Sequence, residues 1–358
     1  MNTLLDLRPD NIKEKLGEKS RICLLGSHPI IQAFQDENVM VMACNIRIKH
    51  AVPGILKAAE ELDAVVAFEL AKSEGDVSGG YTGQTPRIFW DTIVGYTDKT
   101  GFSKPFFIHG DHITVKNLSD EEFESSKALI AAELEAGYTS FAIDASFNEL
   151  DDNIRITTAL AKQISDMKVG LEVEVGEIKS AGQEGKITTV EEALTYIGSL
   201  KDNGINPDLL AINNGSKHGN YLPGEEVHID LRRTGEIFQA IRPYDVCIAQ
   251  HGITGTPLHL MGRFTEYGIR KGNVGTLWQN VAHDHLPDDL LAEMKKWAQD
   301  NNKSIKQATK PFKAQIDSIG PSYQQAIQEH AYQEACEHIK AFRSVGSASL
   351  LKKKLGVA

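Results

Sequence analysis

Three histidines from distant parts of the sequence are the residues best suited to chemistry: His112, His218 and His251. His218 and His251 are each followed by glycine, which lets the backbone approach a ligand closely. Three neutral imidazoles with an open fourth position are typical of catalytic zinc, which polarises a carbonyl or lowers the pKa of bound water. Any one of them alone could be an ordinary loop histidine with backbone hydrogen bonds. Together they predict a zinc site.

A carboxylate stands directly beside the first of these histidines, in the segment PFFIHGDH that starts at Pro105. A strand alternates its faces, so His109 and Asp111 would share one face, and His112 joins Asp111 only if the strand ends there and turns. A buried strand that runs into charged groups costs free energy unless those groups are needed. We therefore predict a metal ligand, His112, next to an acid/base carboxylate, Asp111, at the rim of the fold.

Further carboxylates follow two later strands. The segment LEVEVGE places Glu172 and Glu174 on one strand face. The simplest interpretation is a pair neutralised by lysine or arginine, and the functional one is a second metal position shared with Asp144. Glu184, in the loop GEIKSAGQEGK, could swing in as a base once substrate excludes water. A solvated loop glutamate is the alternative for that residue.

Two glycine-rich turns, HGITGTP and GNVGT, offer backbone N–H groups that could cradle an anion. They follow the seventh and eighth predicted strands. In a barrel of alternating strands and helices, phosphate sites recur at that place.

The composition bounds the class of protein. The chain has 358 residues with a formal net charge of −11, which argues against binding to nucleic acid. Its four cysteines are far apart and form no CxxC pair, so neither a cysteine zinc site nor a redox motif is supported. No apolar run is long enough to cross a bilayer, and no secretory signal precedes Arg8. These features predict a cytoplasmic protein. The amphipathic last helix is suited to the surface or to a partner subunit, and we expect a homodimer or homotetramer.

Eight short apolar segments are separated by helical ones, which favours a (β/α)8 barrel with helical extensions at both ends. We expect one domain over residues 1–358, with the barrel core at about 38–300 and C-terminal helices at about 301–345. A doubly wound open sheet is the alternative, but no GxGxxG follows the first strand. Polar residues end the predicted strands and would share one face of a barrel: Asn45, Glu69, Asp111, His112, Asp144, Glu174, His218, His251 and Asn273.

From about Val39 to Trp278 the chain resembles the class II, zinc-dependent ketose-bisphosphate aldolases, which act on fructose and tagatose bisphosphates. The motifs HGDH, IDAS, EVEVGE, HGNY, HGITG and GNVGT carry this resemblance in order. It implies reversible aldol cleavage of a ketose or ketose phosphate into dihydroxyacetone or its phosphate and an aldehyde, through a metal-stabilised enediolate.

The resemblance also implies roles for individual residues. His112, His218 and His251 match the zinc ligands, Asp111 matches the acid that protonates the aldehyde oxygen, and Glu184 matches the loop glutamate that moves the substrate proton. Asp144 and Glu174 match carboxylates of an accessory site for a second divalent or a monovalent cation. The positions expected to bind the dihydroxyacetone portion are Asn45, Gly219, Gly252, Thr254, Asn273 and Thr276.

The chain departs from the family pattern where the distal end of the substrate would bind. Gly275 stands where the family has aspartate, Leu222 where it has a polar residue, and Glu69-Leu70-Ala71 where it has Gln-x-Ser. Thr254 replaces serine and keeps a hydroxyl. We therefore expect an aldolase whose substrate is not fructose 1,6-bisphosphate. A metal-dependent isomerase or epimerase on the same barrel, or a non-catalytic binding protein, are the alternatives.

Overall fold

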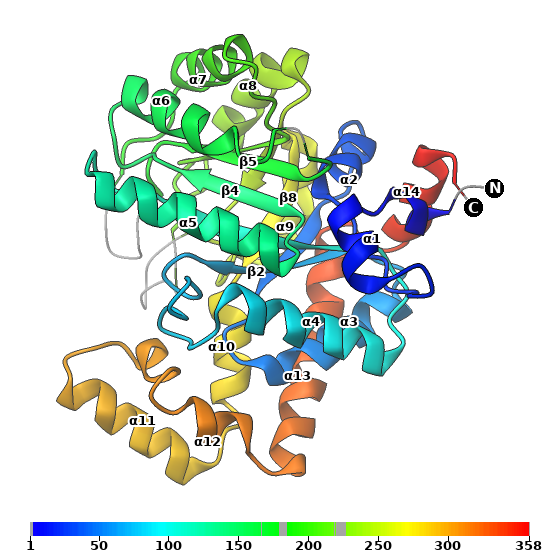
Figure 1. Ribbon diagram of the computed structural model, residues 1–358, viewed down its shortest axis with the longest axis vertical. Coiled ribbons are helices and arrows are strands. Elements are labelled where there is room, and N and C mark those ends of the chain that lie inside the picture. The colour runs from blue at the N-terminus through cyan, green and yellow to red at the C-terminus, as the bar shows by residue number, and fades with distance from the viewer. Residues whose placement is uncertain (1–2, 166, 179–184, 218, 220–226, 358) are drawn as a thin grey trace.

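The computed structural model describes residues 3–165, 167–178, 185–217, 219 and 227–357 (Figure 1). Eight parallel strands pair in sequence order and close on themselves, because β1 pairs with both β2 and β8. The barrel predicted from the sequence is therefore confirmed. The strands are β1 (Val41–Asn45), β2 (Val66–Ala71), β3 (Phe106–Thr114), β4 (Ser140–Asp144), β5 (Gly170–Val175), β6 (Leu209–Ile212), β7 (Cys247–Gln250) and β8 (Ile269–Val274).

Helices surround the barrel and extend it at both ends of the chain (Figure 1). No helix among the described residues is long and apolar enough to span a membrane. The α-helices are α1 (Asp10–Leu16), α2 (Ser27–Phe34), α3 (Val52–Glu61), α4 (Pro86–Thr100), α5 (Asp120–Ala136), α6 (Leu150–Ala161), α7 (Val190–Asp202), α8 (Leu231–Ile241), α9 (Leu258–Phe264), α10 (Thr276–His283), α11 (Asp288–Asp300), α12 (Lys313–Asp317), α13 (Pro321–Ala341) and α14 (Ser347–Leu355). Short 3-10 turns are η1 (Leu4–Leu7), η2 (Lys49–Ala51), η3 (Arg242–Tyr244), η4 (Thr265–Tyr267) and η5 (Ile305–Ala308).

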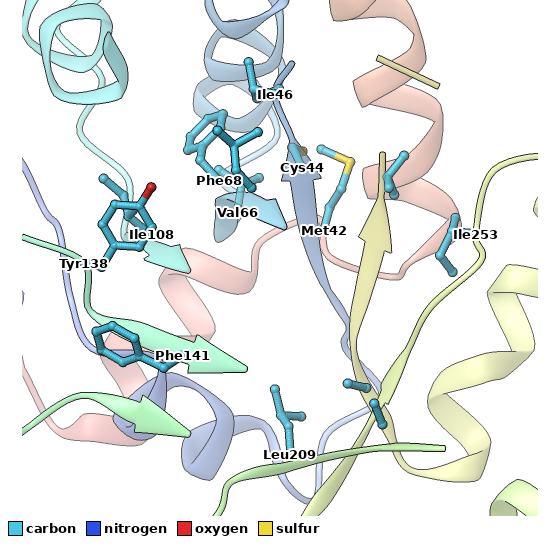
Figure 2. Packing of buried hydrophobic residues seen from close by; sticks show 14 of the residues in the cluster. Met42, Cys44, Ile46, Val66, Phe68, Ile108, Tyr138, Phe141, Leu209 and Ile253 are labelled. Carbon is cyan, nitrogen blue, oxygen red and sulfur yellow. The ribbon is translucent and has the colours of Figure 1, made fainter. Parts of the chain in front are cut away.

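Alternation along β1, β2 and β3 divides their apolar residues between two clusters. Met42, Val66, Phe68 and Ile108 belong to the larger one, between the barrel and its helices (Figure 2). Their neighbours in sequence, such as Val41 and Phe107, belong to a smaller cluster. The N-terminal segment and α14 also contribute to that smaller cluster. The C-terminal helices were expected to end at about residue 345, so α14 was not predicted from the sequence.

The strand that holds Asp111 and His112 does not end there, so that prediction was wrong. β3 continues to Thr114, and its pairing with β4 shifts between Gly110 and Ile113. His112 has a φ of 41°, and this β-bulge lets consecutive residues both line the cavity. A Cβ at Gly110 would overlap the Glu133 carboxyl group on α5, so only glycine fits beside the bulge.

Candidate active site

A cavity of about 500 Å³ opens at the carboxyl ends of the strands. It brings together almost every site residue predicted from the sequence. Those that line it are Asn45, Asp111, His112, Asp144, Glu174, Gly219, His251, Gly252, Thr254, Asn273 and Thr276. His218, Glu184 and Leu222 lie outside the described residues.

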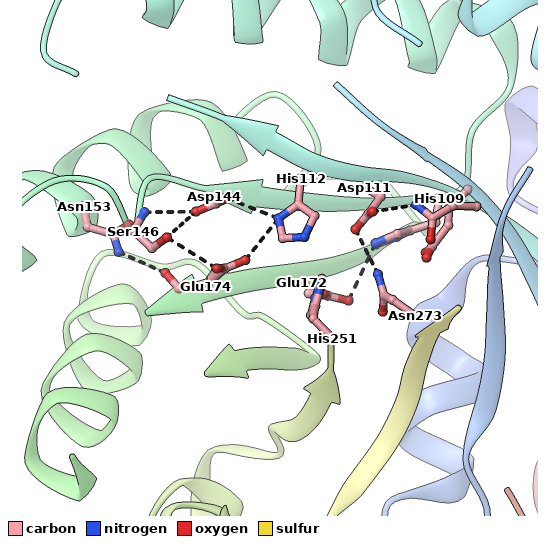
Figure 3. Close-up of polar contacts among 12 residues, drawn as sticks. His109, Asp111, His112, Asp144, Ser146, Asn153, Glu172, Glu174, His251 and Asn273 are labelled. Atoms are coloured by element: carbon pink, nitrogen blue, oxygen red, sulfur yellow. Dashed lines mark hydrogen bonds and ion pairs between the residues drawn. The ribbon is translucent and has the colours of Figure 1, made fainter. Parts of the chain in front are cut away.

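His112 and His251 face one another across the cavity floor, with ring centroids 4.4 Å apart. One ligand atom from each, together with one from Asp111, lies within a 4.8 Å group that could hold a metal ion. His251 Nε2 also lies 2.9 Å from Glu172 Oε1 (Figure 3). A carboxylate in this position fixes the tautomer and the ring orientation of a metal-binding histidine. The residues present therefore fit a divalent cation.

A second group of possible ligands overlaps the first and consists of His112, Asp144 and Glu174. His112 Nδ1 lies 3.3 Å from a carboxylate oxygen of each acid (Figure 3). Ser146 donates to Asp144 over 2.6 Å and holds that side chain in place. Burial and the charge of Asp144 raise the pKa of Glu174 to about 7.

The charges around His112 favour a cation. Burial alone would lower the pKa of His112, but Asp111, Glu174 and Asp144 raise it well above its usual value. The surrounding carboxylates thus stabilise a positive charge at His112. A bound metal ion can supply that charge in place of the proton.

Asp111 is buried, and each of its oxygens accepts a hydrogen bond from an amide. Asn45 Nδ2 lies 2.8 Å from Oδ2, and Asn273 Nδ2 lies 2.9 Å from Oδ1 (Figure 3). Burial would raise the pKa of Asp111, but the positive charges of His112, His251 and Lys271 outweigh burial and lower it. Asp111 is therefore a carboxylate that can accept a proton.

Below this floor a fully buried lysine fills the barrel interior. Lys271 Nζ lies 2.9 Å from Glu172, 3.2 Å from Glu69 and 2.8 Å from Asn273 Oδ1. For Glu172, the expected neutralising lysine is therefore present, whereas Glu174 faces His112. Lys271 was not predicted as a site residue, because β8 has the sequence IRKGNV and nothing in it marks the lysine as buried.

His109 belongs to the same interior layer. Its Nδ1 lies 2.7 Å from Ser140 Oγ, and its Nε2 lies 3.6 Å from Glu172. Burial lowers the pKa of His109 well below its usual value, so the ring is neutral.

The opposite wall of the cavity is built from the segments after β1 and β2. Glu74 is buried there and accepts hydrogen bonds from Arg47 Nε at 2.7 Å and from the Tyr81 hydroxyl at 3.1 Å. Arg47 also donates to Gln279 over 2.8 Å. Neither Arg47 nor Glu74 was predicted as a site residue from the sequence, since no motif marks them.

Gly275 lies against this wall. A Cβ at Gly275 would lie 3.1 Å from Arg47 Nη2 and 3.2 Å from Asn45 Oδ1, so any larger side chain requires Arg47 to move. Lys306, from η5 beyond α11, also lines the cavity here.

The glycine-rich turns after β7 and β8 form the third side. Gly252 has a φ of 68°, and a Cβ there would overlap the backbone of Lys217. Thr254 Oγ1 accepts a hydrogen bond from Leu277 N at 3.2 Å, which ties the two turns together.

Comparison with known proteins identifies the family. The model of the class II fructose-bisphosphate aldolases matches residues 27–344. The chain belongs to this family. Class II aldolases depend on a metal ion, and the two ligand groups described above could hold one. The prediction of a class II aldolase is thus confirmed.

Its relatives carry more than one aldolase name. A fructose-bisphosphate aldolase from Geobacillus stearothermophilus is 28% identical over 70% of this chain and 79% of its own length. The 6-phospho-5-dehydro-2-deoxy-D-gluconate aldolase from Bacillus licheniformis is 26% identical over 69% of this chain and 77% of its own length.

Solved structures share the fold. A fructose-bisphosphate aldolase from Campylobacter jejuni superposes with a TM-score of 0.66 at 15% identity, covering 97% of this chain and all of the other. The YdjI aldolase from Escherichia coli K12 gives a TM-score of 0.65 at 19% identity, covering 91% of this chain and all of the other.

Proposed function

We propose that this protein is a zinc-dependent aldolase that reversibly cleaves a ketose or ketose phosphate into dihydroxyacetone, or its phosphate, and an aldehyde. The observation that supports it most directly is the position of Asp111. Its carboxylate is held by two amides and lies within the same 4.8 Å group as His112 and His251. Metal-dependent aldol cleavage needs a proton acceptor beside a cation site.

His112 and His251, with His218, would hold the zinc ion. When bound, zinc supplies the positive charge that stabilises the enediolate formed on cleavage. Asp144 and Glu174 would hold a second divalent or a monovalent cation, with His112 close to both positions.

Two acids would divide the proton transfers. Asp111 removes the hydroxyl proton during cleavage and returns it to the aldehyde oxygen during condensation. Glu184 moves the proton at the carbon of the dihydroxyacetone portion. The side chains and turns that would bind this portion are Asn45, Gly219, Gly252, Thr254, Asn273 and Thr276.

The substrate is proposed to differ from fructose 1,6-bisphosphate at its aldehyde end. Ala71 offers no hydroxyl there, and the space beside Gly275 is filled by Arg47. The buried Glu74 carboxylate on the same wall is paired with Arg47, so the guanidinium is already engaged by an acid of the protein. A substrate with one phosphate, none, or another anionic end fits this wall better than a bisphosphate.

A cleavage assay on a panel of ketoses tests both parts. The panel contains fructose 1,6-bisphosphate, fructose 1-phosphate, fructose, tagatose and 6-phospho-5-dehydro-2-deoxy-D-gluconate. We expect zinc-dependent cleavage of at least one member other than the bisphosphate. A strong preference for fructose 1,6-bisphosphate would refute the substrate proposal. Proton exchange without any cleavage would favour an isomerase or epimerase, and zinc binding without either reaction would favour a binding protein.

We further propose that residues 1–358 form one domain and that the protein is a homodimer or homotetramer in the cytoplasm. The close packing of α13 on α3 ties the C-terminal region to the barrel and supports a single unit. Analytical ultracentrifugation would measure the number of subunits.

A further inference from the structure

Two asparagine amides hold the Asp111 carboxylate, and an amide can face it in two ways. An amide has a donor end and an acceptor end of nearly the same shape, so the direction in which it points is set by its other neighbours. Only the NH2 end stabilises a carboxylate, because a carboxylate accepts and does not donate.

The neighbour that sets the direction of Asn273 is Lys271. Its Nζ lies 2.8 Å from Asn273 Oδ1, and an ammonium group has donors only. The oxygen of Asn273 must therefore face Lys271, and its NH2 group must face Asp111, where the distance is 2.9 Å. Asn45 is held in the matching way, since its NH2 group lies 3.3 Å from the Glu74 carboxylate, an acceptor.

Lys271 is itself held by two buried acids, Glu172 at 2.9 Å and Glu69 at 3.2 Å. Its side chain has no exposure to solvent. The charges of Glu172 and Glu69 outweigh burial and raise the pKa of Lys271, so it stays an ammonium. Glu172 also contacts His251. Lys271 is thus linked to Asp111 through Asn273 and to His251 through Glu172, although it does not line the cavity.

We propose that Lys271 is a positioning residue: by fixing the direction of the Asn273 amide, it keeps Asp111 ready to accept the substrate proton. This inference rests on the proposed aldolase function. It assigns Lys271 no contact with substrate or metal, and it predicts a defect confined to the step that uses Asp111.

The test compares two reactions of the Lys271→Met variant. Cleavage of the best ketose of the panel requires Asp111, whereas proton exchange at the carbon of dihydroxyacetone phosphate does not. We expect kcat for cleavage to fall on the order of 100-fold, with KM and the exchange rate within about threefold of wild type. Bound zinc should be unchanged, and Lys296→Met, an exposed lysine on α11, serves as the control.

A double-mutant cycle makes the test sharper. If Lys271 acts through Asp111, Asp111→Ala combined with Lys271→Met is no slower in cleavage than Asp111→Ala alone. Additive losses would overturn the proposal. So would an equal loss of cleavage and exchange in Lys271→Met, since this would indicate a general structural role.

Removing Lys271 leaves buried acids without their partner, which can prevent folding. The variant Lys271→Met/Glu172→Gln removes a charge of each sign and keeps the loss of the orienting donor. With zinc in excess, it should show the same selective loss of cleavage, and normal cleavage in this folded variant would overturn the proposal. If the wild-type protein itself neither cleaves nor exchanges, the proposed function fails, whatever the variants show.

Discussion

The two sides of the cavity are built in different ways. One side, from β3 to β8, holds His112, Asp144, Glu174, His251 and the glycine-rich turns, each near the carboxyl end of its own strand or just after it. The other side joins Arg47, Glu74 and Tyr81 from the segments after β1 and β2 with Lys306 from η5.

We propose that the first side carries out the reaction and that the second side selects the substrate. The first side contains the groups proposed here for metal binding and proton transfer. The second side holds a buried Arg47–Glu74 pair and lies beside Gly275, one of the positions at which the chain departs from the family pattern. A family can keep its reaction and change its substrate when the two functions lie on separate walls. The predictions below test this division.

The largest effect is expected at Asp111. Asp111→Ala removes the proton acceptor, and kcat for cleavage should fall by about 1,000-fold. Zinc content and proton exchange on dihydroxyacetone phosphate should be retained, since the three histidines are proposed to hold the ion and Glu184 to move the exchanged proton. Stopped-flow or coupled assays would measure cleavage, and isotope exchange the second reaction. Unchanged cleavage would remove Asp111 from the mechanism.

On the same side of the cavity, replacing a metal-binding histidine should weaken the binding of zinc. His251→Ala and His218→Ala should each lower zinc affinity by about 100-fold or more, because each removes one ligand. Metal analysis after dialysis would measure this, with His259→Ala, on the exposed side of α9, as the control. A chelator should abolish wild-type activity, and added zinc should restore it. Near-normal zinc content in His218→Ala would contradict that assignment.

A smaller and different effect is expected on the second side. Glu74→Gln removes a negative charge but keeps the size of the side chain, so it should change substrate choice rather than chemistry. The ratio of kcat/KM between a substrate with an anionic aldehyde end and a neutral one should rise about tenfold. Exchange on dihydroxyacetone phosphate should stay constant. If Glu74→Gln slows exchange as strongly as cleavage, the two walls are not separate in function.

The smallest effect is expected at the other end of the barrel. His28 Nδ1 lies 2.5 Å from Asp208 Oδ1, just before β6 begins. The hydrogen bond to Asp208 raises the pKa of His28. A raised folded-state pKa stabilises the protein below the unfolded value of about 6.5, and that contribution is lost as the pH rises through the folded value.

Denaturation at pH 5.5 and pH 8.5 would measure this contribution. His28→Asn should lower the free energy of unfolding more at the lower pH, by less than about 1 kcal/mol because half of the side chain is exposed. Cleavage activity should not change, since the residue is remote from the cavity. A larger loss at pH 8.5 would contradict the assigned direction.

Much of the fold and of the first side could be predicted from the sequence. Eight apolar segments separated by helices indicated the barrel, and a barrel places the ends of its strands on one face. For this reason eleven predicted site residues line one cavity although they are distant in the sequence. The bulge in β3 could not be predicted, because it is a shift in the pairing of β3 with β4, and the sequence does not show the register of two strands.

By itself, then, the sequence determined which residue types end each strand, and the periodicity of the strands determined that they meet. Only the tertiary structure decided what surrounds those residues. The pairing of Arg47 with Glu74, and the place of Lys271 between Glu69, Glu172 and Asn273, depend on strands and loops that meet across the barrel. A buried charge is tolerated only beside a group of opposite charge. The sequence alone does not show which residues the pairing of the strands brings together.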